Sequence, residues 1–545
     1  MSQAHAANLS VLLSQTAALF AQRPGLILEE RSWTWREIDE RVDALVQALH
    51  SLGMRPGHKL LVQSRNNLAL FESCWAAFRL GAVWVPVNFR LTAPEVAYLG
   101  SASEATVMLA EDCFAAHVDA VRGASTHLAQ VVTIGTPRAG EHGYEALLAA
   151  HAGAPKAVAD VEADTPAWYF YTSGTTGKPK AAVLTHGQLA FVVTNHLADL
   201  IPGTTEKDCS IAVAPLPHGA GIHALLNVAR GAATVLPPSD RLEPRSFWAL
   251  VERHRVSNVF TVPTIVKMLV EDASVDEFDH RSLRYLIYAG APMYRADQKR
   301  ALQKLGPVLV QYFGLGEVTG CITVLPPSMH SPDDADANAH VGSCGRPRTG
   351  MEVAILDAQM QRLPTGEVGE ICCRGPAVFA GYFDNPEATA KALRGGWFHT
   401  GDLGRMDAQG LLYITGRESD MYISGGSNVY PREVEEILLT HPAVREAAVL
   451  GVPDAKWGEV GVAVLVCGQD APTPEDILAH LDGRCARYRW PRHVFFWDSL
   501  PKSGYGKVTK NEIRRLLAER GEIGEVATHL TKPSFSTDDR SQHNY

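Results

Sequence analysis

Residues 167–180 read AWYFYTSGTTGKPK. The first five of these residues are apolar or aromatic and predict a buried strand. The stretch from Thr172 to Lys180 then combines two glycines, which let the backbone approach an anion, with four hydroxyl groups and two lysines. Residues 189–200 have apolar side chains at helical spacing, so we predict a strand, a loop and a helix in that order. Such a loop is suited to hold a nucleotide's phosphates and indicates an enzyme that uses ATP.

The loop differs from the usual P-loop. A P-loop has four residues between its first glycine and Gly-Lys, and Ser or Thr after them. Here two residues separate Gly174 from Gly177, and Pro179 follows the lysine. For the loop taken alone, the alternative is a polar surface hairpin rich in Thr and Gly.

Length and composition limit the class of protein. At 545 residues the chain exceeds what one hydrophobic core normally supports, so we expect at least two domains. A formal net charge of −10 gives no reason to expect nucleic acid or anionic lipid as a partner. Nine scattered cysteines without a C-x-x-C pair indicate reduced thiols and a cytoplasmic location. We expect no membrane span, because no window of about eighteen apolar residues occurs.

Strand-like apolar runs alternate with helical patterns in the first part of the chain, which predicts α/β layers with parallel sheets. The runs are Leu60–Gln63, Ala82–Val87, Val107–Leu109, Val131–Ile134, Ile211–Ala214 and Val259–Val262, and the helical patterns include Trp35–Leu52 and Ser246–Arg255. After about residue 345, short strands separated by turns predict a β-rich subdomain.

The predicted fold class is therefore α/β. We expect a large N-terminal domain, residues 1–416, made of layered α/β subdomains plus the β-rich subdomain. A polar hinge at 417–420 would connect it to a small, mobile α+β C-terminal domain at 421–523. The polar residues 524–545 are expected to be disordered.

Four further motifs follow the glycine loop in order. They are Tyr312-Phe313-Gly314-Leu315-Gly316-Glu317, Trp397-Phe398-His399-Thr400-Gly401-Asp402, Gly416-Arg417 with Ser424-Gly425-Gly426, and Pro501-Lys502-Ser503-Gly504-Tyr505-Gly506-Lys507. As a set they resemble the adenylate-forming superfamily, which includes acyl-CoA synthetases, peptide-synthetase adenylation domains and luciferases. The resemblance covers residues 10–520. It implies an acid–thiol ligase that activates a fatty or aryl acid with ATP and Mg²⁺ and transfers the acyl group to coenzyme A.

The resemblance also implies roles for single residues. Lys507, Glu317 and Thr172 would be catalytic, with Lys507 as the adenylation lysine and Glu317 as the Mg²⁺ ligand. Asp402 would accept the ribose hydroxyls and Arg417 would reach the ribose or the α-phosphate. The phosphate loop would comprise Thr172, Ser173, Gly174, Thr175, Thr176, Gly177 and Lys180. Other nucleotide or coenzyme A contacts would come from Gly290, Ala291, Pro292, Gln311, Tyr312, Phe313, Gly314, Gly425, Gly426 and Trp457.

The implied acyl pocket is rich in small residues, which would leave room for an apolar acyl or aryl group. Its residues are His218, Gly219, Gly221, Val262, Ala289, Gly290, Gly314 and Leu315. His218 has a structural alternative as a satisfied core histidine. Arg417 has one as a salt bridge, and Glu317 or Lys507 taken alone would be solvated surface groups. Gly316 stands where relatives usually have threonine, and Ser419 where they have Asp or Lys.

Two alternative functions remain open at this stage. One is a stand-alone adenylating enzyme that loads a carrier protein, although no carrier domain is evident after residue 520. The other is a non-catalytic acyl-nucleotide sensor, against which the retention of Glu317, Asp402, Arg417 and Lys507 argues. The sequence leaves open which carboxylic acid is used, the pathway and the oligomeric state, for which a homodimer is one option at the family level.

Overall fold

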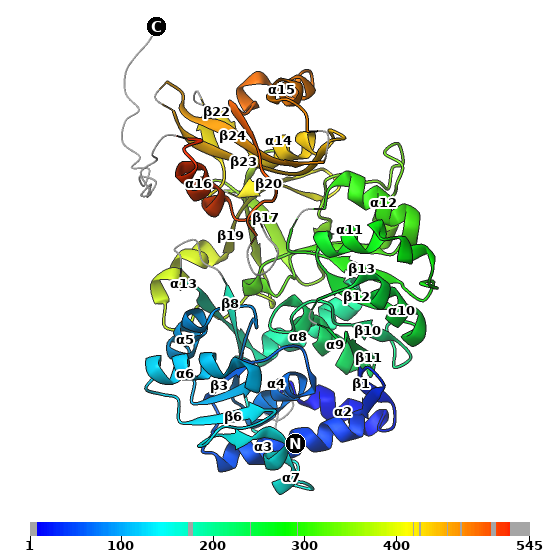
Figure 1. The fold of residues 1–545 in the computed structure, drawn as a ribbon, viewed down its shortest axis with the longest axis vertical. Coiled ribbons are helices and arrows are strands. Elements are labelled where there is room, and N and C mark those ends of the chain that lie inside the picture. The colour runs from blue at the N-terminus through cyan, green and yellow to red at the C-terminus, as the bar shows by residue number, and fades with distance from the viewer. Residues whose placement is uncertain are drawn as a thin grey trace. The chain divides into compact units, whose positions relative to one another are not determined.

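The computed structural model describes residues 8–172, 178–239, 241–291, 293–417, 419–424, 427–454, 456–468, 471–502 and 508–523. The chain forms two compact units, Met1–Glu418 and Ser419–Tyr545 (Figure 1). The large unit contains two α/β layers and a β-rich part, and the small unit mixes helices with a sheet that is antiparallel except for one edge strand. The predicted fold class is thus confirmed.

The first α/β layer is a seven-stranded sheet in the order β7-β6-β5-β3-β4-β8-β9. Its strands pair in parallel except β8 with β9. The strands are β3 (Lys59–Gln63), β4 (Val83–Val87), β5 (Val107–Glu111), β6 (Gln130–Ile134), β7 (His142–Gly143), β8 (Pro166–Thr172) and β9 (Lys180–Thr185). The helix α3 (Trp35–Ser51) precedes the first of these strands, and α4 (Leu68–Leu80), α5 (Ala93–Ala102), α6 (Ala115–Ala124) and α7 (Tyr144–Ala150) lie between them in the chain. The sequence prediction of a parallel α/β layer is confirmed.

The predicted order of strand, loop and helix around the glycine loop was incomplete. A second strand, β9, follows the loop and pairs antiparallel with β8, with Thr172 opposite Lys180. The helix α8 (His186–Asp199) begins only after β9. Residues 181–185, AAVLT, are too short and apolar to show a period, but they pair with β8 and their side chains are largely buried. The Thr185 side chain then accepts a hydrogen bond from the backbone N–H of Gln188 and starts the helix.

The second layer is a nine-stranded sheet in the order β16-β15-β14-β13-β12-β10-β11-β1-β2. Its strands are β1 (Pro24–Leu28), β2 (Arg31–Thr34), β10 (Cys209–Ile211), β11 (Ala233–Leu236), β12 (Asn258–Thr261), β13 (Tyr285–Tyr288), β14 (Leu309–Phe313), β15 (Thr323–Leu325) and β16 (Arg346–Pro347). The six strands from β14 to β1 are parallel to one another. Because the carboxyl ends of parallel strands lie at one edge, the segments that leave β10, β12, β13 and β14 meet there.

Helices cover both faces of this sheet. On one face lie α10 (Pro244–His254), α11 (Pro263–Glu271) and α12 (Arg295–Leu305), which Figure 1 shows grouped together. On the other face lies α9 (Gly219–Arg230), which packs against α8 and against α2 (Val11–Leu19). The helix α8 therefore links the two α/β layers, since it follows β9 in one layer and contacts α9 of the other.

The β-rich part of the large unit is a four-stranded antiparallel sheet. It contains β17 (Glu352–Leu356), β18 (Gly369–Arg374), β19 (Phe398–Met406) and β20 (Leu412–Arg417), in that order. A short helix, α13 (Pro386–Ala392), lies between β18 and β19 in the chain. The predicted change to short strands after about residue 345 is confirmed.

The small unit is built on an antiparallel pair of long strands, β23 (Val444–Asp454) and β24 (Gly458–Cys467). The strands β21 (Tyr422–Ser424), β22 (Ser427–Val429) and β25 (His493–Phe496) extend its sheet, and α14 (Pro431–Leu438), α15 (Pro474–Leu481) and α16 (Lys510–Glu519) complete the unit. A proline occupies the first turn of α14 and of α15, where its missing N–H has no helical partner to lose. Within the described residues, none of the helices combines the length and the apolar character needed to cross a bilayer.

Candidate active site

Glu317 lies where the two α/β layers meet. It belongs to a single helical turn, η3 (Gly316–Val318), that follows β14, and it is only 6% exposed. Its carboxylate Oε1 accepts a hydrogen bond from the Thr172 hydroxyl at 3.1 Å and another from the Tyr382 hydroxyl at 2.9 Å. Thr172 ends β8, so the start of the glycine loop lies directly beside this carboxylate. The solvated-surface alternative for Glu317 does not hold.

Sequence reasoning missed Tyr382. Its segment pairs with β9 through a hydrogen bond from the Val183 N–H to the Gly381 carbonyl, at 2.9 Å, and through an isolated bridge between Tyr382 and Ala182. Burial, and then the negative charge of Glu317, raise the pKa of the Tyr382 phenol, so it remains a donor to that carboxylate. The Lys180 ammonium lies 5.4 Å from the centre of the same ring. Nothing in the local sequence signals these contacts, because they depend on pairing between distant segments.

The predicted acyl-pocket residues gather at the carboxyl edge of the nine-stranded sheet. His218 and Gly219 follow β10, Val262 follows β12, and Ala289 with Gly290 follows β13. The next position, Ala291, is half-buried. Because β10, β12, β13 and β14 are neighbours in the sheet, these positions lie side by side.

The neighbouring strand β14 supplies Gln311, Tyr312 and Phe313 and leads into Gly314 and Leu315. The Gln311 side chain accepts a hydrogen bond from the Tyr288 hydroxyl at 3.1 Å. The Tyr312 ring stacks on the Phe260 ring of β12, with centroids 5.7 Å apart. The structure therefore brings together the described members of both the predicted acyl pocket and the β14 motif.

Three glycines at the carboxyl edge of the nine-stranded sheet lie so close to other parts of the chain that a side chain would not fit there. A Cβ on Gly219 would lie 2.5 Å from Cζ of Phe260, and one on Gly221 would lie 2.1 Å from the Leu216 carbonyl oxygen. A Cβ on Gly314 would similarly lie 2.4 Å from the Cα of Gly320. The room that the small residues were expected to leave for an acyl group is thus occupied at these positions by other parts of the chain.

Gly316, the departure from the usual threonine, has a packing explanation. A Cβ at this position would lie 2.7 Å from the Phe170 ring and 2.9 Å from Cγ2 of Thr172. The Phe170 ring in turn meets the His218 ring edge-on, with centroids 5.7 Å apart. The aromatic side chain at position 170 therefore takes the space that a side chain at 316 would need.

Asp402 and Arg417 face each other across β19 and β20. The Arg417 Nε lies 3.2 Å from Oδ1 of Asp402, whose side chain is 8% exposed, whereas the Arg417 side chain is 52% exposed. A buried carboxylate beside an accessible guanidinium can bind a group that both accepts and donates hydrogen bonds, such as a ribose. The salt bridge that was the alternative interpretation of Arg417 is formed in the structure, and it is compatible with binding a ribose.

A second carboxylate orders the loop that leads to Asp402. Glu370 Oε1 accepts a hydrogen bond from the Gly401 N–H at 3.2 Å, while Oε2 lies 2.7 Å from His399 Nδ1 and 2.9 Å from the Arg394 guanidinium. The Cys372 thiol, whose pKa burial raises to about 12, lies 3.3 Å from the same His399 nitrogen. Glu370, Cys372 and His399 are side-chain types that bind metals. Because Arg394 already neutralises Glu370, we assign this cluster to holding the loop.

Trp457 lies in the small unit, in the turn between β23 and β24. Its indole is 42% exposed, and its backbone N–H donates to Asp454 Oδ1 at 2.9 Å. Other predicted site residues lie outside the described residues: Ser173, Gly174, Thr175, Thr176, Gly177, Pro292, Gly425, Gly426 and Lys507. Residues 524–545, predicted to be a disordered tail, also lie outside them.

Comparison with known sequences matches two parts of the chain. The sequence model of the AMP-binding enzyme family matches residues 13–383, and that of the AMP-binding enzyme C-terminal domain matches residues 433–507. The chain belongs to this family. The resemblance inferred from the five motifs is thereby confirmed.

Individual relatives and structures agree. A feruloyl-CoA synthase of Amycolatopsis is 36% identical over 491 residues, which span 88% of this chain and 93% of the relative. An indoleacetate–CoA ligase of Aromatoleum aromaticum is 33% identical over 94% of this chain and 99% of the relative. Among solved structures, the anthranilate CoA ligase AuaEII in complex with anthranoyl-AMP superposes with a TM-score of 0.85 at 25% identity, covering 95% of this chain and 98% of that one.

Proposed function

We propose that this enzyme is an AMP-forming acid–thiol ligase that joins a hydrophobic carboxylic acid to coenzyme A. The observation that carries the proposal is the junction at Glu317, where the end of β8, the turn after β14 and the segment of Tyr382 meet around one buried carboxylate. The relatives support the substrate class, since they include CoA ligases for feruloyl, indoleacetate and anthranilate groups. All three of these groups are aryl acids.

In the first step, a carboxylate oxygen attacks the α-phosphorus of ATP, and the bond to pyrophosphate breaks. Two anions must approach each other, so the site has to neutralise charge that moves during the transfer. Thr172 begins the predicted phosphate loop and donates to Glu317, and Lys180 ends the loop and lies over the ring of Tyr382, which donates to the same carboxylate. We assign them to holding the β- and γ-phosphates.

Glu317 suits the role of Mg²⁺ ligand. Thr172 and Tyr382 both donate to Oε1, so they fix the orientation of the carboxylate, and no hydrogen bond to Oε2 occurs within the described residues. An oriented, buried carboxylate oxygen is a ligand that a hard cation prefers. When bound, Mg²⁺ would neutralise charge on the phosphates.

Asp402 and Arg417 are assigned to the nucleotide's ribose, and Arg417 also to its α-phosphate. Lys507 is proposed as the cation that contacts the carboxylate and the α-phosphate during adenylation. In the second step, the thiol sulfur attacks the acyl carbon, the carbon–oxygen bond to AMP breaks, and AMP leaves with that oxygen. Trp457, Gly425 and Gly426 are proposed to line the path of the pantetheine group.

The remaining predictions concern the hinge between the two units, the cellular location and the oligomeric state. We propose that residues 417–420 act as the hinge on which the small unit, bounded at 421–523, moves between the two steps. We further propose that the enzyme works in the cytoplasm, where ATP and reduced thiols are available. A homodimer stays a prediction.

The test is pyrophosphate release by the purified protein with ATP and Mg²⁺ against a panel of aliphatic and aryl carboxylates, each with and without coenzyme A. The ligase predicts release that depends on coenzyme A and yields a thioester. Release that ignores coenzyme A but loads a carrier protein would instead favour the carrier-loading enzyme. An absence of release with every acid would favour the sensor.

A further inference from the structure

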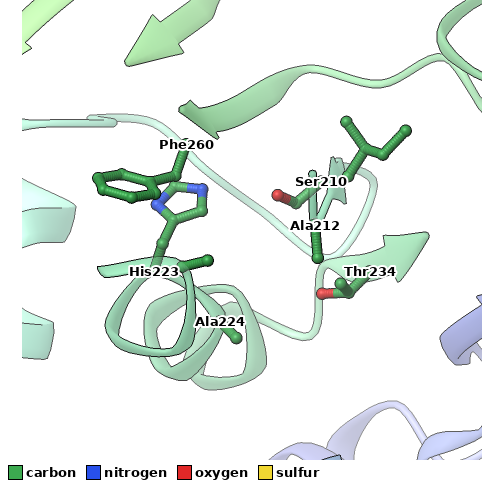
Figure 2. A pocket seen from close by; sticks show the side chains of 8 residues that line it. Ser210, Ala212, His223, Ala224, Thr234 and Phe260 are labelled. Atoms are coloured by element: carbon green, nitrogen blue, oxygen red, sulfur yellow. The ribbon is translucent and has the colours of Figure 1, made fainter. Parts of the chain in front are cut away.

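The cavity beside α9 is too small to bind a substrate group. Figure 2 shows it between the stacked rings of His223 and Phe260 on one side and Ser210, Ala212 and Thr234 on the other. It has room for about one water molecule, roughly 10 Å³, and most of the side chains around it are apolar. Charged groups that can serve the reaction occur instead in the small unit, at both ends of the segment that contains Lys507.

The backbone brings the two ends of this segment together. Lys502 and Val508 form an isolated antiparallel bridge, and the Thr509 N–H donates to the Pro501 carbonyl at 3.1 Å. The two ends of the segment therefore lie side by side. Because Lys507 directly precedes Val508 in the chain, a displacement of this bridge would be passed on to Lys507.

An ion pair holds the first end of the segment. The Lys502 ammonium lies 2.8 Å from Oε2 of Glu446, a residue of β23. The strand β23 pairs with β24 from Val444 to Asp454, so the backbone of Glu446 is part of a regular sheet. The ion pair therefore ties Lys502 to this sheet.

A second ion pair lies just after the other end. The Lys510 ammonium lies 2.7 Å from Oε1 of Glu435, which belongs to α14. The same oxygen accepts a hydrogen bond from the Val449 N–H of β23 at 2.8 Å. The Lys510 and Glu435 side chains are 18% and 13% exposed, so water screens this pair less than a pair on the open surface. Glu435 thus connects α14 and β23 to the residue at which α16 begins.

The helix α16 is itself anchored to β23. Its residues Ile513 and Leu517 are fully buried and belong to the same hydrophobic cluster as Leu450 of β23. The Arg514 guanidinium of α16 also donates to the Gly451 carbonyl of that strand at 3.2 Å. Both ends of the segment are therefore attached to β23, one through Glu446 and the other through α16 and Glu435.

We propose that Glu435 and Glu446 are positioning residues for adenylation, which act through Lys510 and Lys502 on the segment that carries Lys507. A cation that acts in a transition state has to be placed closely, because an error of about 1 Å can cost roughly 100-fold in rate. In this role neither carboxylate needs to touch a substrate. The inference rests on the proposed function and adds two residues to it. If these were ordinary surface ion pairs, their loss would change little.

The first test measures the two steps of the reaction separately in Glu435→Gln and Glu446→Gln. Adenylation is followed as pyrophosphate release in a single turnover with ATP, Mg²⁺ and the best acid of the panel. The thioester step is followed as AMP release when the acyl-adenylate of that acid is supplied with coenzyme A. Because Lys507 is proposed to act in adenylation, each variant should slow that step by about tenfold, through kcat rather than through KM for ATP.

The thioester step is the internal control, and it should keep the rate of the unaltered enzyme. A general loss of structure would slow both steps. Equal slowing of both steps, or an unchanged rate of adenylation, would therefore overturn the inference.

Glu433→Gln is the matched control variant. Glu433 also lies on α14 and pairs with a cation at 2.7 Å, but that cation is Arg489 of η6 (Arg487–Arg489). This variant should adenylate at the rate of the unaltered enzyme. If it slowed adenylation as much as Glu435→Gln does, the inference would be overturned.

Lys507→Ala sets the largest effect that mispositioning can have. It should lose adenylation and keep the thioester step. An unchanged rate of adenylation in this variant would overturn the role of Lys507 and this inference with it. Absence of pyrophosphate release by the unaltered enzyme with every acid would instead refute the ligase function itself.

The second test reverses the charges of the more exposed ion pair. Lys502→Glu and Glu446→Lys each place like charges side by side, so each should slow adenylation by about tenfold or more. The double variant restores an ion pair and should recover most of the rate. A double variant as slow as the single ones would overturn the inference, because these two side chains would then not act through each other.

Discussion

Replacing Tyr382 by Phe removes one hydroxyl from the junction around Glu317. The ring beneath the Lys180 ammonium stays, so the change isolates the 2.9 Å hydrogen bond to the carboxylate. A hydrogen bond to a charged group contributes about 1.5–3 kcal/mol, which corresponds to roughly 10- to 150-fold. Thr172 still donates to the same oxygen, so we expect the lower end, a fall of about tenfold in kcat/KM for ATP. Because the carboxylate is less well oriented, the Mg²⁺ concentration for half-maximal rate should also rise.

The assay is pyrophosphate release over a matrix of ATP and Mg²⁺ concentrations. Tyr413→Phe is the matched control, since the Tyr413 hydroxyl donates to the Asp407 carboxylate at 3.1 Å in a part of the sheet without a predicted site residue. The control should keep the kinetics of the unaltered enzyme. If Tyr382→Phe left kcat/KM and the Mg²⁺ dependence unchanged, or if both variants lost activity equally, the assignment of this junction to metal and phosphate binding would be refuted.

Three further outcomes follow from packing and burial. In Gly316→Thr the new Cβ would lie 2.7 Å from the Phe170 ring. The substitution should therefore not improve ATP binding, and it should cost about 1–3 kcal/mol of stability in thermal unfolding. Tighter ATP binding by this variant would contradict the packing explanation. Arg79→Met should cost about 3–5 kcal/mol in denaturant unfolding, since it removes the cation paired with buried Asp43 and one of the two cations paired with Asp39, which keeps Lys156. Arg348→Met should cost about 1 kcal/mol or less, because within the described residues that guanidinium makes no hydrogen bond and lies 4.0 Å from the Asp199 carboxylate; equal costs would contradict this. Burial lowers the pKa of His186 to about 4. Between about pH 6.5 and 4, this histidine is therefore protonated in the unfolded chain but neutral in the folded one. Folding stability consequently falls as the pH drops through that window. His186→Phe should therefore reduce the pH slope of stability there by about 1.4 kcal/mol per pH unit, and an unchanged slope in guanidinium denaturation would contradict the buried neutral state.

Much of the fold is predictable from the sequence, because buried parallel strands have a strong apolar signal. The strands β3 to β6 lie within a few residues of the expected runs, and the helix α3 matches the expected Trp35–Leu52 to within one residue. The strand β9 was missed since its five residues after Lys180 show no period of their own. Its identity depends on pairing with β8, a contact that local reasoning does not contain.

The candidate site also divides into features that the sequence predicts and features that depend on pairing elsewhere in the chain. The motifs predicted that Thr172 and Glu317 act together, and the structure places their side chains 3.1 Å apart although they are distant in sequence. Tyr382 could not be predicted, because its role depends on the segment that pairs with β9. Gly316 could be noticed as a departure, but its reason required the position of the Phe170 ring. Residues that belong to a motif were predictable even where the motifs are distant in sequence, whereas residues outside the motifs that depend on contact between distant segments were not.

The most direct test of the central claim follows the oxygen atoms of the substrate. The enzyme would turn over a carboxylic acid with both carboxyl oxygens isotopically heavy, together with ATP, Mg²⁺ and coenzyme A, and mass spectrometry would locate the label. Formation of an acyl-adenylate and its cleavage by the thiol predict one heavy oxygen in every AMP released and the other in the thioester. Unlabelled AMP alongside a labelled thioester would contradict the account, because the carboxylate would then never have been bonded to the α-phosphorus.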